Sequence, residues 1–233
     1  MFTTSPSASH RSGRNLLDLA PAVASSALLL FLIAVFVAPG CSQTATGSAW
    51  RTLPRAGAEP LLRLLAEPVR REGDPQETKP RFELTGSALE VRIANTTRAV
   101  MPVIIRYMDS TNVNCRLAVY TADRKHSSFV ALPLNASYDS CLGMERLGIA
   151  DLNHDGIVDL IYKVYVPSNR TAERVWEGAV YLSTKDAAAP YCFAPDISRT
   201  VTLYKPPETV ETFIANEVKR RGLKVLDCYK PSD

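Results

Sequence analysis

The sequence predicts a β-rich α+β domain, built as an antiparallel sheet or sandwich with one C-terminal helix and preceded by a signal and lipidation segment. From Arg81 onward apolar and polar residues alternate, as in Ala88–Ile93, which is the period of a strand with one buried face. Near the C-terminus a single segment has helical spacing. We therefore expect a signal peptide over residues 1–40, a tether with a short helix over 41–80 and the β-rich domain over 81–233.

The amino terminus has the pattern of an export signal. Arg11 and Arg14 precede an uncharged stretch that runs from residue 19 to residue 50. Within it, Ala27–Ala38 is uninterrupted apolar sequence, which is the length of a signal-peptide core and short for a membrane span. The pattern therefore predicts that the folded part of the chain lies outside the cytoplasm.

The end of this stretch resembles the bacterial lipobox, because a small residue, Gly40, precedes Cys41. By this resemblance Cys41 would be acylated, with palmitate for example, and become the first residue of a lipoprotein. Ser42 after the cysteine would direct it to the outer membrane. The alternative is an uncleaved anchor, since residues 21–40 could just span a bilayer. Both alternatives predict a cell-envelope protein tethered to a membrane.

Between this stretch and the strands we expect little regular structure. Residues 42–57 are small and polar, which is typical of a tether. Residues 59–71 have apolar side chains near helical spacing, with Pro60 suited to a helix start and Pro68 to its end. This helix would pack on its own domain or lie against anionic headgroups. Residues 73–80 are charged and contain proline, as a linker does.

The strands follow in antiparallel pairs. We expect strands over 88–93 and 100–107 with a turn at 95–97, and over 115–121 and 128–132 across Asp123–Lys125. Further strands are expected over 157–166, 175–182, 200–204 and 223–228. Residues 208–221 are the best helix, because Val210, Phe213, Ile214 and Val218 form one face and Gly222 follows a basic last turn.

Cysteine usage supports an oxidising compartment. Beyond Cys41 an even number remains, namely Cys115, Cys141, Cys192 and Cys228, which suits disulfides. Three pairings can be drawn, and we favour Cys115 with Cys141 and Cys192 with Cys228 because each closes a moderate loop. No C-x-x-C spacing occurs, which disfavours a zinc site or thioredoxin-like chemistry.

One loop specifies chemistry. Residues 151–159 read Asp-Leu-Asn-His-Asp-Gly-Ile-Val-Asp, with oxygen-bearing side chains at alternate positions and a glycine where the chain must turn sharply. Calcium takes six to eight oxygen ligands. The predicted side-chain ligands and one backbone carbonyl come from Asp151, Asn153, Asp155, Ile157 (carbonyl) and Asp159. His154 would point outward, and Tyr162 at position 12 excludes an EF-hand.

With its flanking strands this loop resembles the FG-GAP/VCBS repeat of β-propellers and secreted bacterial proteins. The resemblance covers residues 147–182 in one copy, and it implies that calcium binds the loop. A propeller repeats its blade four to eight times, so we do not expect a full propeller here.

Composition and missing motifs limit the function. The 27 basic and 24 acidic residues nearly balance and form no basic cluster, which argues against nucleic acid as a partner. No H-E-x-x-H, G-x-S-x-G or P-loop occurs. We therefore predict no catalytic residues and a lipoprotein with a structural calcium loop, which acts as a binding or scaffold module for an envelope protein or glycan. The alternatives are an envelope-acting hydrolase and an immunity or inhibitor lipoprotein.

Overall fold

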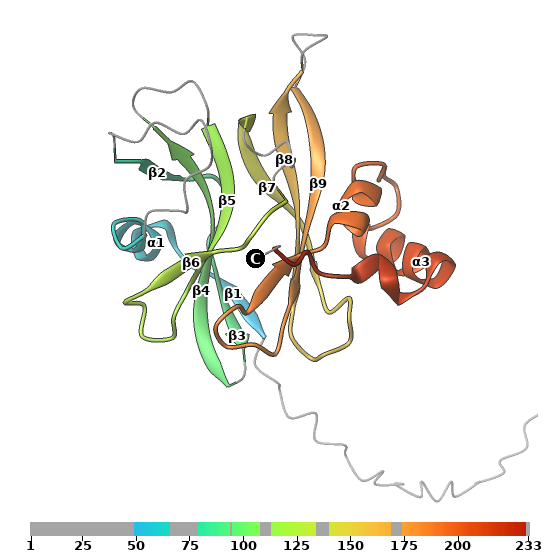
Figure 1. Cartoon of the computed structure of the whole chain (residues 1–233), viewed down its shortest axis with the longest axis horizontal. Helices are drawn as coiled ribbons and strands as arrows, with labels where there is room; N and C mark the ends of the chain where they lie inside the picture. Colours follow the sequence, from blue (N-terminus) through green and yellow to red (C-terminus); the bar gives the residue numbers. More distant parts are fainter. Residues whose placement is uncertain are drawn as a thin grey trace, which may run out of the picture. The chain divides into compact units, whose positions relative to one another are not determined.

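Two antiparallel sheets form the centre of the protein (Figure 1). The computed structural model describes residues 49–65, 79–93, 95–107, 113–133, 140–168 and 174–231, all within one compact unit that spans 45–233. The predicted β-rich α+β class with antiparallel sheets is confirmed.

The first sheet has the strand order β1-β3-β4-β5-β6, and β2 pairs with the other half of the same edge of β4. Its strands are β1 (Trp50–Thr52), β2 (Arg81–Leu84), β3 (Leu89–Ile93), β4 (Thr96–Arg106), β5 (Val113–Tyr120) and β6 (Ser127–Phe129). The predicted turn between β3 and β4 is present, with Asn95 at φ 63°, a left-handed conformation that asparagine tolerates better than most residues.

The second sheet is a meander, with the strand order β10-β9-β8-β7. Its strands are β7 (Gly143–Ala150), β8 (Asp159–Pro167), β9 (Arg174–Ser183) and β10 (Tyr191–Phe193). The β7–β8 pairing shifts register between Arg146 and Gly148. Such a bulge adds one residue to a strand and changes which side chains share a face.

The main core lies between the two sheets and joins buried side chains of β3, β4 and β5 to those of β7, β8 and β9. Val100 and Ile104 of β4 face this core, whereas Met101 and Val103 belong to a second core on the outer face of the first sheet. Because both faces of β4 are covered, its sequence is a nearly continuous apolar run instead of a strict alternation.

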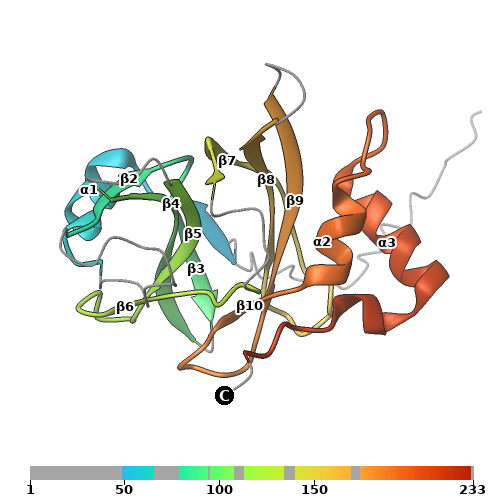
Figure 2. The same ribbon diagram turned by 45° about the horizontal axis from the view of Figure 1, so that its top comes forward.

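Helices cover the two outer faces, as Figures 1 and 2 show. Helix α1 (Arg55–Leu62) packs Ala58 and Leu61 on the first sheet, while α2 (Pro195–Val201), α3 (Val210–Arg221) and the 3₁₀ helix η2 (Leu223–Leu226) form a third core on the second sheet. Gly178 of β9 permits this packing, because a Cβ there would lie 2.5 Å from the Ser198 carbonyl oxygen.

The predicted disulfides are both confirmed. Cys115 bonds to Cys141 and Cys192 bonds to Cys228. The first bond joins β5 to the segment that leads into β7, and the second joins β10 to the C-terminal segment, where the Tyr229 amide also donates to the Phe193 carbonyl. Cys115 and Cys141 belong to the core between the sheets, whereas Cys192 packs against the third core, under α2 and α3.

Several predicted elements were wrong. Residues 200–204 end helix α2 and a turn instead of forming a strand, and 223–226 form η2. The C-terminal helix α3 is confirmed, with Thr209 as its N-cap, but it is not the only helix there. The predicted 59–71 helix begins earlier, at Arg55, and contains Pro60 inside it; its second half lies outside the described residues.

The predicted tether was also wrong in part, because Trp50–Thr52 forms β1 and pairs with β3. Arg51 of β1 and Arg124 of the β5–β6 turn both donate to the carboxylate of Glu90, which is 4% exposed. These bonds lower the pKa of Glu90 against the opposing effect of burial, the bond from Arg51 contributing most. The domain therefore includes residues before position 81.

Candidate metal-binding loop

The Asp-rich loop connects β7 to β8 at one end of the second sheet. Gly156 has φ +85°, so the expected need for a glycine in a left-handed turn is confirmed. His154 also has a positive φ, 58°, and its side chain is exposed, in agreement with its predicted outward direction. Strands β7 and β8, which flank the loop, are neighbours in one sheet and hold its two ends side by side.

Oxygen atoms of the loop point inward to its own amides. The Asp151 carboxylate accepts from the amides of Asp155 and Gly156 at 3.0 and 2.9 Å. Asn153 Oδ1 accepts from the Asp155 amide at 3.1 Å, and Asp155 Oδ1 accepts from the Ile157 amide at 2.9 Å. These are local Asp and Asn turns, and they direct three of the predicted ligand side chains toward the inside of one loop.

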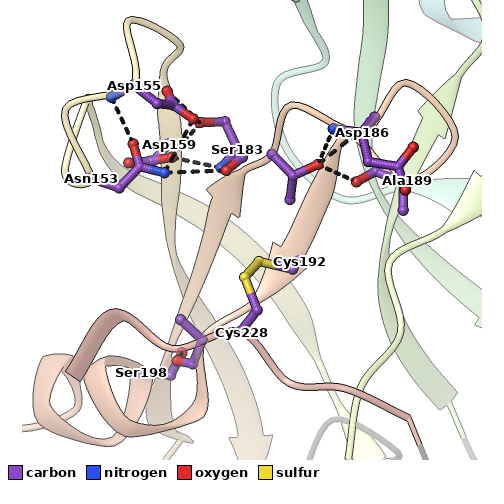
Figure 3. The surroundings of a disulfide bond; sticks show 11 residues. Asn153, Asp155, Asp159, Ser183, Asp186, Ala189, Cys192, Ser198 and Cys228 are labelled. Atoms are coloured by element: carbon purple, nitrogen blue, oxygen red, sulfur yellow. Dashed lines mark hydrogen bonds between the residues drawn. A yellow bond between two sulfur atoms is a disulfide. The ribbon is translucent and has the colours of Figure 1, made fainter. Parts of the chain in front are cut away.

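The fourth side chain, Asp159, is the first residue of β8 and is fully buried. Its Oδ2 accepts from the Leu152 amide at 2.6 Å, and its Oδ1 accepts from the Ser183 amide at 2.6 Å. The Ser183 hydroxyl lies 2.9 Å from Asp159 Oδ1 and 3.1 Å from both carboxylate oxygens of Asp155 (Figure 3). A single hydroxyl therefore lies between two carboxylates, although it has only one proton to donate.

The electrostatics of the site follow from this burial. Removal from water, together with a smaller effect of the neighbouring charge of Asp155, raises the pKa of Asp159 to about 6. The bonds from Ser183 and Leu152 act in the opposite direction. Burial likewise raises the pKa of Tyr191, whose hydroxyl donates to the Val158 carbonyl at 2.9 Å. Ionisation of Asp159 at neutral pH therefore lowers the stability of the native state.

The donor set fits a hard cation in its chemistry, because carboxylates, an amide oxygen and a carbonyl are the ligands that calcium prefers. Within the described ranges Asp151, Asp155 and Asp159 form no ion pair with an arginine or lysine. As the side chains lie, however, the described residues contain no group of three or more His, Cys, Asp or Glu placed to hold a metal. Closing around a cation would therefore require Asp151 to turn from the amides that it accepts.

Sequence reasoning missed Ser183. It lies at the end of β9, 24 residues after Asp159, and it reaches the loop because β8 pairs with β9. Asn153 Nδ2 also donates to the Ser183 carbonyl at 3.2 Å. A polar residue directly after the predicted strand 175–182 was the only signal, and it indicates a strand end more often than a site.

Other predicted sites are placed as follows. Cys41 lies outside the described residues, as does the whole predicted signal peptide. In the part of the chain that the structure describes, no helix is long and apolar enough to cross a membrane.

A separate hollow of about 250 Å³ lies beside β6 and β10, lined by apolar residues that include Phe129, Val130 and Tyr191.

Comparison with known proteins gives no relative. No protein-family model matches the chain, and no curated protein or solved structure matches it. The second sheet is a four-stranded antiparallel meander, and strands β3 to β6 of the first sheet also pair consecutively.

Proposed function

We propose that the protein is a membrane-tethered module of the cell envelope that binds another envelope protein or glycan and whose loop 151–159 holds calcium. The observation that carries the calcium proposal is the approach of two carboxylates, Asp155 and Asp159, to one buried hydroxyl, with no ion pair from an arginine or lysine of the described ranges. Two disulfides support placement in an oxidising compartment.

In this proposal each loop residue has a definite task. Asp159 is held by the Leu152 and Ser183 amides and would be the fixed ligand. Asp151, Asn153 and Asp155 sit on turns, so their side chains can rotate onto the cation without moving the strands, and the Ile157 carbonyl completes the set. Calcium would supply the positive charge that two converging carboxylates lack. The result would be a stiff connection between β7 and β8.

A thermal melt of the full chain, purified in detergent with its disulfides intact, tests the calcium proposal. Extracellular calcium modules bind with dissociation constants of about 0.1–1 mM. Calcium at ~5 mM would then stabilise the native state by about 1–2 kcal/mol relative to EDTA, which corresponds to a rise of several degrees in melting temperature. Equal melting temperatures in EDTA and calcium would contradict the proposal.

A matched pair of variants assigns the effect to the loop. Asp155→Asn removes a charge but keeps an oxygen acceptor for the Ile157 amide, so we expect the calcium-dependent rise to disappear. Asp186→Asn makes the same change at a turn between β9 and β10, where Asp186 Oδ1 accepts from the Ala188 amide at 2.8 Å. This control should keep the full rise, and a loss in both variants would indicate a nonspecific charge effect.

Lipid labelling tests the anchor. Cells expressing the chain and fed an alkyne analogue of palmitate should label it, and Cys41→Ala should abolish the label. The double variant Cys192→Ala, Cys228→Ala serves as the control, because it removes two other cysteines without touching the predicted lipidation site. Labelling that survives in Cys41→Ala would contradict a lipid anchor at this residue.

A further inference from the structure

Each polar group of Ser183 contacts a predicted calcium ligand. Its amide donates to Asp159 Oδ1 at 2.6 Å, and its carbonyl accepts from Asn153 Nδ2 at 3.2 Å. Its hydroxyl lies 2.9 Å from Asp159 Oδ1 and 3.1 Å from both carboxylate oxygens of Asp155 (Figure 3). Ser183 therefore belongs to the site of the loop, although it lies on β9 and far from the loop in sequence.

Strand pairing fixes the position of this hydroxyl. Ser183 is the last residue of β9, pairs directly with Tyr191 of β10 and is 3% exposed. The Tyr191 hydroxyl donates in turn to the carbonyl of Val158, the residue before Asp159. The Ser183 hydroxyl is thus held by two strands, whereas the side chains of the loop sit on turns.

Hydrogen bonding alone does not account for both carboxylate contacts of the hydroxyl. A serine hydroxyl has one proton to donate, and an ionised carboxylate only accepts. Ser183 can therefore donate to Asp159 or to Asp155, but not to both at once. The other contact brings oxygen lone pairs within about 3 Å of each other without a proton between them. A cation shared by these oxygens would replace that repulsion by attraction.

The spacing of the oxygens also fits a shared coordination shell. Calcium holds its oxygen ligands at about 2.3–2.6 Å, often in a pentagonal bipyramid, so neighbouring ligands lie about 2.7–3.7 Å apart. The contacts of Ser183 Oγ with Asp155 and Asp159, at 3.1 and 2.9 Å, are within this range. The loop offers one donor from each of five residues, namely Asp151, Asn153, Asp155, Ile157 and Asp159. Calcium takes six to eight oxygens, so these five donors leave at least one position to fill.

We propose that Ser183 is a calcium ligand contributed by β9, whose hydroxyl oxygen joins the donors of loop 151–159. This inference rests on the proposed calcium site. The hydroxyl is a neutral donor, like the water molecules that complete many calcium sites, so it adds no charge to the three carboxylates. It can keep its proton on one carboxylate while a lone pair binds the cation. The cation then joins the loop to β9 as well as to β8.

Terbium luminescence of the full chain, in detergent and with its disulfides intact, tests this inference. Terbium chloride is the probe that replaces calcium, and Tyr191, beside the loop, should sensitise the bound ion. Decay rates in H₂O and D₂O count the water molecules on the ion, because O–H vibrations quench its emission and O–D vibrations do not. We expect Ser183→Ala to hold one more water than the wild type, and to bind calcium about tenfold more weakly by calorimetry.

Two control variants separate a ligand from a structural serine. Ser198→Ala removes another buried hydroxyl, which donates to the Ala194 carbonyl and accepts from the Val180 amide. It does not touch the loop and should keep the water count and the calcium affinity of the wild type. Ser183→Thr keeps the hydroxyl and should keep both as well. An extra water in Ser198→Ala, or a wild-type count in Ser183→Ala, overturns the inference.

The outcomes distinguish this inference from the calcium proposal. If calcium displaces terbium from the wild type but Ser183→Ala binds calcium with unchanged affinity, the loop binds calcium without Ser183, and only this inference is overturned. If the wild type binds neither ion, both are overturned. Ser183→Cys replaces Ser183→Ala if circular dichroism shows that the alanine variant does not fold. Its sulfur is a poor donor for a hard cation, so calcium should again bind about tenfold more weakly, and an unchanged affinity overturns the inference.

Discussion

Buried Asp159 should make the calcium-free protein lose stability as the pH rises. Its pKa in the native state is about 6, against 3.8 as the reference value, so the native state binds the proton more tightly than the unfolded state does. The stabilisation from this proton is complete below pH 3.8 and is lost as the pH rises through 6. A difference of about two pKa units corresponds to about 2–3 kcal/mol of unfolding free energy.

Urea unfolding at pH 4.5 and pH 7, in EDTA, measures this effect. Other carboxylates titrate over the same range, and Glu90, with its lowered pKa, acts in the opposite direction. The Asp159→Asn variant removes only the titration at 159, so the difference between wild type and variant isolates it. Between pH 4.5 and pH 7 we expect the unfolding free energy of the wild type to fall by about 2 kcal/mol relative to that of the variant.

Calcium should reverse the trend. Protons and a cation compete for the same carboxylates, so calcium should stabilise the wild type more at pH 7 than at pH 4.5. The reasoning is refuted if the difference between wild type and Asp159→Asn in EDTA is independent of pH. It is equally refuted if the wild type gains stability relative to the variant as the pH rises.

Three further changes test the fold that holds the loop. Gly178→Ala should lower the unfolding free energy by about 1–3 kcal/mol through overpacking against α2; an unchanged urea midpoint would show that α2 can shift. Replacing both Cys192 and Cys228 by alanine should lower the unfolding free energy by about 3–4 kcal/mol relative to the oxidised wild type. Under reducing conditions the wild type loses the same disulfide, so the two proteins should then differ little. Thr209→Ala removes the N-cap of α3 and should cost about 1 kcal/mol; a thermal melt with no change would contradict the capping role.

Local patterns were sufficient for the elements that they control. Alternation located β3 and the β8–β9 pair, and the Asp-Gly turn chemistry of the loop, including φ +85° at Gly156, follows from residues within nine positions of one another. The helix α3 could be predicted because its cap, its charges and its apolar face all agree.

Elements decided by distant contacts could not be predicted. Residues 195–201 contain Ile197, Thr200 and Val201, whose β-branched side chains favour a strand, yet they form α2 because Gly178 on β9 leaves space for a helix. Pro195 and Asp196 are helix-start signals that could have indicated it. Trp50–Thr52 is too short a segment to be identified without its partner β3.

The same limit applies to the sites. The loop residues are neighbours in sequence, whereas Ser183 reaches Asp159 only through the pairing of β8 with β9. No spacing within the sequence contains this relation.

Calorimetric titration of calcium into the EDTA-treated chain, after EDTA is removed, tests the central claim most directly. The account predicts one site per chain for the wild type and for Asp186→Asn, and no measurable binding for Asp155→Asn. Equal binding to all three proteins, or no binding to the wild type at millimolar calcium, would contradict a calcium site at residues 151–159.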